Sequence, residues 1–81
     1  MDIKVKLYAT LRKFGPEGLA IGESFTIQGK PGWTIADLVN SLGIPPESAK
    51  LTLVDGTHQN HDFVFPESGA SIAIFPPVGG G

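Results

Sequence analysis

One amphipathic helix stands among several segments of alternating polarity, and this pattern restricts the fold more than any other feature of the sequence. The helix is predicted to begin after Thr34, with Asp37 at the spacing of a capping box, and Gly43 is placed to end it. Its apolar side chains recur at helical spacing on one face: Ile35, Leu38, Val39 and Leu42. Because one helix can cover only one face of a sheet, the sequence predicts an α+β fold with the other sheet face open.

The strands are predicted from alternating apolar and polar residues. The segments concerned are 3–9, 24–28, 51–53, 61–65 and 71–75, and a glycine-containing loop is expected over residues 13–22. Together they predict a mixed sheet of four to five strands with one main helix packed on one face. On this alternation, the open face carries the following side chains: Lys4, Lys6, Tyr8, Thr26, Thr52, Ala73 and Phe75.

Length and composition exclude several classes of protein. With 81 residues, the chain is expected to form one domain over residues 1–75, followed by an extended tail over residues 76–81. It contains no cysteine, which excludes disulfides, thiolate metal sites and a cysteine nucleophile. A net charge of −2 with scattered basic residues argues against nucleic-acid binding. Without a long apolar run or a signal-peptide pattern, we expect a cytoplasmic protein that does not bind membranes.

The C-terminal sequence Phe75-Pro76-Pro77-Val78-Gly79-Gly80-Gly81 is the main functional signal. Prolines lack an N–H group and end strand pairing, whereas glycines fit where any side chain would collide. The tail over residues 76–81, at about 3.3 Å per residue, gives a reach of roughly 20 Å. This order suits a flexible tail that carries its terminal carboxylate into another protein. A frayed terminus without function is the alternative interpretation.

A carboxylate is a poor electrophile, and nothing in the sequence would activate it. A partner enzyme that uses ATP and Mg²⁺ can convert it to an acyl-adenylate. A sulfur nucleophile would then leave a thiocarboxylate on Gly81, whereas a lysine amine would give an isopeptide bond. We therefore expect this chain to bind no cofactor itself and to act as a co-substrate rather than as an enzyme.

Tyr8 and Phe75 are large rings at outward positions of the first and last predicted strands. If these strands are parallel neighbours, both rings lie on one face near the start of the tail and suit a docking surface. Ordinary scattered surface aromatics are the alternative. Arg12 follows the first strand and is expected either to form a salt bridge at the rim of this surface or to stay solvated.

His58 and His61 form an H-x-x-H pair in a polar stretch. Because a metal site needs three or four converging ligands, we interpret this stretch as a solvated loop and expect no bound metal. Trp33, just before the helix, is interpreted as a packing residue or as part of a hydrophobic staple.

Several parts of the chain resemble the small subunit of molybdopterin synthase, in the same order and over nearly the whole length. They are residues 5–12, 34–38, 54–56 and 73–78, followed by Gly80-Gly81. The ending Phe-Pro-Pro-Val-x-Gly-Gly is the most specific of them. On these residues the chain is identified as a member of the MoaD/ThiS family of sulfur carriers, whose fold is the ubiquitin-like β-grasp.

The resemblance implies that the first and last strands are central and parallel. It also implies that a ubiquitin-activating-like enzyme adenylates Gly81, next to Gly80, and that Gly81 then becomes a thiocarboxylate. In the molybdenum-cofactor branch, the tail enters the large subunit of the synthase and donates sulfur to a pterin precursor. Partner contacts are implied at Tyr8, Arg12, Phe75, Pro76, Pro77, Val78 and Gly79.

The family leaves alternatives open for the pathway. Its carriers also serve tungsten-cofactor, thiamine and cysteine synthesis, and some members are conjugated to lysines as ubiquitin-like modifiers. Gly79 stands where the family often has alanine, which should only loosen the tail. The ending favours the pterin branch over the lysine-linked modifier, and a β-grasp interaction module with an inert tail is the third alternative.

Overall fold

The structure is a computed structural model of the chain and describes residues 1–78. Its elements are β1 (Asp2–Leu7), the 3₁₀ helix η1 (Ala9–Phe14), β2 (Ser24–Gln28), α1 (Ile35–Ser41), the 3₁₀ turn η2 (Pro46–Ser48), β3 (Leu51–Val54), β4 (Thr57–His58) and β5 (Ala70–Phe75). Within residues 1–78, no helix is long and apolar enough to cross a membrane.

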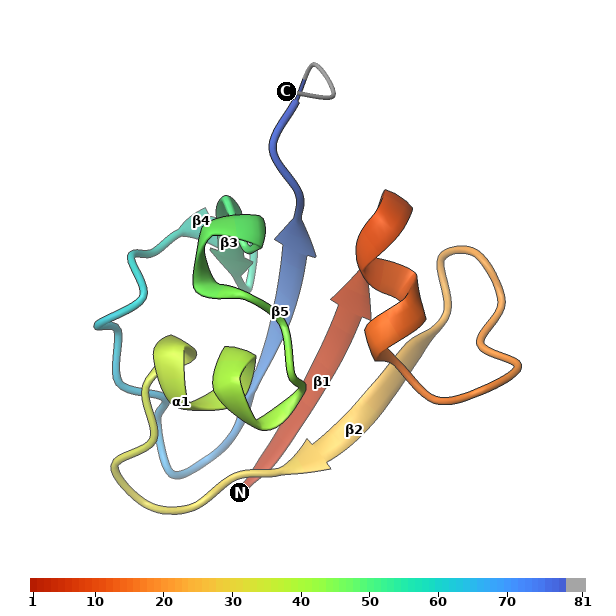
Figure 1. Cartoon of the computed structure of the whole chain (residues 1–81). Coiled ribbons are helices and arrows are strands. Elements are labelled where there is room, and N and C mark those ends of the chain that lie inside the picture. Colours follow the sequence, from red (N-terminus) through yellow and green to blue (C-terminus); the bar gives the residue numbers. More distant parts are fainter. Residues whose placement is uncertain (79–81) are drawn as a thin grey trace.

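The sheet places the first and last strands at its centre. Its strand order is β2-β1-β5-β3-β4, with β1 and β5 parallel and the other neighbouring pairs antiparallel. Figure 1 shows α1 against one face of this sheet. The predicted mixed sheet, with one main helix on one face and parallel central strands, is therefore confirmed.

The ends of α1 are determined by local hydrogen bonds. Thr34 and Asp37 form the predicted capping box, because each side chain accepts a hydrogen bond from the backbone N–H of the other. At the other end, Gly43 has a φ of +79°, which a glycine adopts without strain. The N–H groups of Gly43 and Ile44 donate to the carbonyls of Asn40 and Val39, both at 3.1 Å, which is the Schellman pattern.

The core lies between α1 and the inner face of the sheet. Two central strands, the helix and the surrounding loops all contribute to it. Its buried side chains are Ile3, Val5, Leu7, Leu11, Ile35, Leu38, Val39, Ile44, Ala49, Val54, Phe65, Ile72 and Ile74. Burying each of the larger aliphatic and aromatic side chains among them stabilises the fold by about 1.5–3 kcal/mol.

The third strand faces the opposite way from the prediction. Thr52 is opposite Ile74 and is only 1% exposed, whereas Leu53 is opposite Ala73 on the open face. The prediction that Thr52 lies on the open face is therefore wrong. The hydroxyl of Thr52 can be buried because its Oγ1 donates a 2.6 Å hydrogen bond to the carbonyl of Gln59.

The first predicted strand is too long at its C-terminal end. β1 ends at Leu7, and Ala9 is exposed with a φ of +52° at the start of η1. This left-handed residue turns the chain out of the sheet. Because η1 continues to Phe14, the predicted loop over residues 13–22 starts later than expected.

The short strand predicted over residues 61–65 is also wrong. In this stretch only Val64 makes a β-bridge, with Thr34, and Phe65 turns into the core. The additional strand is β4, which pairs with β3 across a two-residue turn at Asp55-Gly56. The φ values of Asp55 and Gly56, +48° and +86°, fit a type I′ hairpin turn.

Candidate functional site

The end of β5 is held next to the end of β1. Because the two strands are parallel, Leu7 lies beside Ile74, and the N–H of Tyr8 donates to the Ile74 carbonyl at 3.2 Å. The rings of Tyr8 and Phe75 then stack, with centroids 4.2 Å apart and planes 12° apart. The predicted proximity of these two rings, which depended on a parallel pairing, is confirmed.

Two leucines of β3 extend this aromatic pair. Leu51 lies opposite Phe75, and Leu53 lies opposite Ala73. We call this set the tail-exit patch: Tyr8, Leu51, Leu53, Ala73 and Phe75. Leu51 is 39% exposed, so part of its apolar side chain is accessible to a partner. The sequence-based prediction missed both leucines because it placed them in the core.

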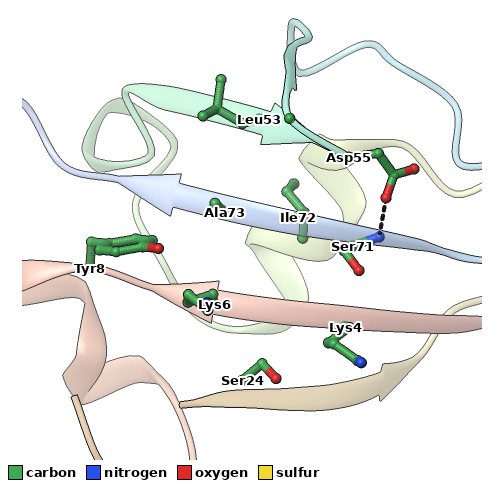
Figure 2. Close-up of a pocket in the computed structure, with 10 residues that line it drawn as sticks. Lys4, Lys6, Tyr8, Ser24, Leu53, Asp55, Ser71, Ile72 and Ala73 are labelled. Carbon is green, nitrogen blue, oxygen red and sulfur yellow. Dashed lines mark hydrogen bonds between the residues drawn. The ribbon is translucent and has the colours of Figure 1, made fainter. Parts of the chain in front are cut away.

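A hollow of about 420 Å³ adjoins the tail-exit patch on the open face. Figure 2 shows Lys4 and Lys6 along β1, with Leu53 and Asp55 on the far side of β5. Asp55 is held by the backbone of β5, since its Oδ1 accepts a 3.1 Å hydrogen bond from the Ser71 N–H. The hollow therefore has cationic side chains on one side and an anionic side chain on the other.

The tail begins where the last ladder hydrogen bond ends. The carbonyl of Phe75 accepts from the N–H of Lys50 at 3.0 Å, and Pro76 and Pro77 then offer no N–H. Val78 is 98% exposed, so its apolar side chain is fully available to a partner. The predicted site residues Gly79, Gly80 and Gly81 lie outside the described residues.

Arg12 lies on η1, close to the end of β1. Its Nη2 donates a 3.4 Å hydrogen bond to the carbonyl of Leu19, and its Nε is buried without a partner among residues 1–78. A second hollow of about 420 Å³, which Lys13 and Glu17 also line, opens beside this guanidinium. The arginine is thus half-buried against the loop after η1, rather than extended into solvent.

With this geometry established, sequence comparison identifies the family. The sequence model of the family described as Mut7-C ubiquitin matches residues 1–79. The chain belongs to the Mut7-C ubiquitin family. No curated protein sequence matches it.

Solved structures share the ubiquitin-like fold of this family member. SAMP1 of Haloferax volcanii is 21% identical over 100% of both chains, with a TM-score of 0.66. A second structure, of H. volcanii small archaeal modifier protein 1, is 20% identical over 95% of this chain and 98% of that one, with a TM-score of 0.66. A putative molybdopterin converting factor subunit 1 of Pyrococcus furiosus is 22% identical over 95% and 98%, with a TM-score of 0.67.

These likenesses confirm the predicted ubiquitin-like β-grasp fold and the resemblance to MoaD-like proteins. At such low identity they are likenesses of fold, and they include both a protein named as a modifier and one named as a converting-factor subunit. The role of the tail-exit patch in partner binding stays a prediction.

The polar stretch of this ubiquitin-like chain is less exposed at His61 than predicted. His61 is half-buried, and its Nε2 donates a 2.8 Å hydrogen bond to the carbonyl of Ala49. The interpretation of this stretch as a solvated loop is therefore wrong for His61, whereas His58 is exposed on β4. Within residues 1–78, no group of three potential metal ligands converges. Trp33 packs against the core, as predicted for a packing residue.

Proposed function

We propose that this chain is a ubiquitin-like carrier that docks through the tail-exit patch and presents the carboxylate of Gly81 to partner enzymes. The observation that carries the proposal is the Tyr8–Phe75 stack, because it lies at the residue where β5 ends and the Pro76-Pro77 segment begins. Docking and presentation of the tail are thereby coupled. A partner that binds the patch therefore meets the tail, which starts at Pro76, at a fixed position relative to the bound surface.

The dimensions support this division of roles. Residues 76–81 span roughly 20 Å when extended, at about 3.3 Å per residue. Two prolines restrict the backbone near the patch, so less conformational entropy is lost when the tail enters a channel. The glycines beyond Val78 carry no side chain that would obstruct a narrow channel.

The proposed chemistry takes place in the partners. An activating enzyme resembling ubiquitin-activating enzymes would join the Gly81 carboxylate to ATP, forming the acyl-adenylate and releasing pyrophosphate, with Mg²⁺ neutralising the phosphate charge. A sulfur nucleophile such as an enzyme persulfide would then displace AMP, and reductive cleavage of the resulting sulfur–sulfur bond by a thiol would leave the thiocarboxylate. This chain supplies the electrophilic carbon and its position.

The sulfur acceptor we propose is a pterin precursor of the molybdenum or tungsten cofactor, bound to a large synthase subunit. The ending Phe-Pro-Pro-Val and the likeness to a protein named as a molybdopterin converting factor subunit support this choice. Carriers for thiamine or cysteine synthesis use the same activated glycine. An assay of sulfur transfer therefore has to offer the acceptors of those pathways beside the pterin precursor.

A second candidate function is conjugation of Gly81 to lysines of target proteins. The equally close likeness to a protein named as a small archaeal modifier favours it. It uses the same adenylate, and the two functions differ only in whether sulfur or a lysine amine attacks the carbonyl carbon.

The intact mass of the protein from its own host tests both functions. Replacement of one oxygen by sulfur on the C-terminal peptide supports the carrier, and a peptide branch on target lysines that ends in Gly81 of this chain supports the modifier. The same spectrum establishes whether Gly81 carries the free carboxylate. An unmodified Gly81 that is also inert toward ATP and each candidate activating enzyme would overturn both functions and favour an interaction module.

A further inference from the structure

β2 is a sheet edge with an open flank. It pairs with β1 on one side only, and Figure 1 shows it at one border of the sheet. The opposite border is β4, which has only two residues and offers little to an added strand. The edge formed by Ser24–Gln28 is therefore the longer pairing surface of the two.

The hydrogen bonds at one end of the β1–β2 ladder show which groups of β2 point outward. The N-terminal nitrogen of Met1 donates to the Gly29 carbonyl at 3.1 Å, and the Gly29 N–H donates to the Met1 carbonyl at 2.8 Å. In an antiparallel pair, such doubly bonded positions alternate with unbonded ones. Phe25 and Ile27 consequently direct their backbone groups to β1.

The alternate residues of β2 direct their N–H and C=O groups away from the sheet. They are Ser24, Thr26 and Gln28. Within residues 1–78, no further strand or loop pairs with these backbone groups. The strand also lacks the features that usually protect an edge, since residues 24–28 contain neither a charged residue nor a proline, and their register with β1 is uninterrupted.

We propose that β2 pairs antiparallel with β2 of a second copy of this chain, about a two-fold axis that passes midway between the two Thr26 residues. In this register Thr26 is opposite Thr26 of the second copy, and Ser24 is opposite Gln28, so every outward N–H and C=O group meets a partner. On the helix side, Phe25 is opposite Ile27 of the second copy. Aromatic–aliphatic and Thr–Thr cross-strand pairs both stabilise antiparallel sheets.

The side chains of β2 favour a second copy over an unrelated peptide, because in this register the strand pairs favourably with its own sequence. The same register places Glu23 of one copy opposite Gly29 of the other, so its carboxylate has no charged side chain directly across from it, and the two-fold axis repeats this arrangement at the other end. Residues 24–28 carry no charge, so no like charges face each other across the strands. The sequence of β2 is in this sense complementary to itself.

The proposed dimer is weak and leaves the tail-exit patch free. A ladder of one short strand buries less than the roughly 1,200–2,000 Å² of a stable interface, so we expect a dissociation constant on the order of 0.1–1 mM. The two-fold axis is perpendicular to the sheet. Both open faces therefore lie on the same side of the dimer, and both tail-exit patches remain accessible. The inference is independent of the chemistry at Gly81.

Mixed isotope labelling in NMR tests the register directly. Phe25 and Ile27 of the second copy form an unbonded antiparallel pair, in which the α-carbons approach to about 4.5 Å. We expect an intermolecular Overhauser effect between their α-protons at millimolar concentration, with slower amide exchange at Ser24, Thr26 and Gln28. A monomer at that concentration, or a dimer whose contacts lie on the open face, would overturn the proposal.

Substitutions at Thr26 separate edge pairing from folding. Thr26→Pro removes an outward N–H without removing a hydrogen bond to β1, and Thr26→Lys brings two ammonium groups together; each should weaken the dimer at least tenfold. Thr26→Val and the charge control Asn40→Lys on α1 should retain it, as should deletion of Gly80-Gly81. Pairing of β2 with a peptide from another protein, in the absence of self-association, would contradict the assignment to a second copy.

Discussion

At the scale of single residues, the stack of Tyr8 on Phe75 links the folded domain to the tail. Tyr8 is the first residue after β1 and Phe75 is the last residue of β5, so the parallel pairing of these strands brings their C-terminal ends to one place. The tail therefore leaves the domain beside this stacked aromatic pair.

Phe75→Ala should weaken binding to the activating enzyme by ~1–2 kcal/mol, because a central aromatic anchor at an interface contributes about this much. Titration calorimetry with the purified partner measures it. Val64→Ala is the matched control, since Val64 is an exposed apolar residue beside Thr34 and outside the tail-exit patch. Equal affinities of the two variants would show that the patch is not the docking surface.

Thr52→Val should lower the free energy of unfolding by about 1–2 kcal/mol, although valine has nearly the same shape. The substitution leaves the Gln59 carbonyl without its hydrogen-bond donor in a buried place. Thr26→Val, on the exposed side of β2, should change stability by no more than about 0.5 kcal/mol. Urea unfolding followed by circular dichroism distinguishes the two, and a neutral Thr52→Val would show that the hydrogen bond from Thr52 to Gln59 does not stabilise the fold.

At the scale of elements, α1 is a short helix whose two ends are both capped. Seven residues are too few for a helix to be stable alone, so the caps and the burial of one face determine whether it forms. The capping box at Thr34 and the Schellman motif at Gly43 each satisfy backbone groups that the helix leaves free.

Thr34→Ala should destabilise the domain by about 1 kcal/mol, because the Asp37 N–H loses its acceptor. Thr10→Ala, an exposed threonine on η1, serves as the control and should be nearly neutral. Thermal unfolding of the two variants provides the comparison. If Thr34→Ala unfolds at the same temperature as the wild type, the capping box does not stabilise α1.

At the scale of the whole molecule, the domain and the tail are expected to have separable roles. Deleting Gly80-Gly81 should abolish adenylation and sulfur transfer while leaving the unfolding transition unchanged. Gly81→Ala should slow transfer without unfolding the domain, because a methyl group is added beside the reacting carbonyl. Pyrophosphate release, thiocarboxylate mass and thermal unfolding are measured on the same preparations. Transfer at the wild-type rate by either variant would contradict a role for this ending.

Local features of the sequence were sufficient to predict the elements whose cause is also local. The helix over residues 35–41 follows from its apolar spacing and from Thr34, Asp37 and Gly43. The turn at Asp55-Gly56 follows from residues that tolerate a positive φ. The tail-exit aromatics Tyr8 and Phe75 were found from the alternation of the first and last strands, and the parallel pairing that brings them together was implied by the resemblance to a known family.

Only the tertiary structure decided which face of β3 is buried. Alternation along a strand has a period of two residues and is satisfied equally by either face, so Leu51 and Leu53 were placed in the core and Thr52 outside. The hydrogen bond from Thr52 to Gln59 and the packing of Val54 beside Ile72 reverse that choice. The short strand β4 and the ordered position of His61 likewise depend on contacts between distant residues. The sequence by itself determined the local elements and the composition of the tail, whereas the tail-exit patch formed only when β1, β5 and β3 came together.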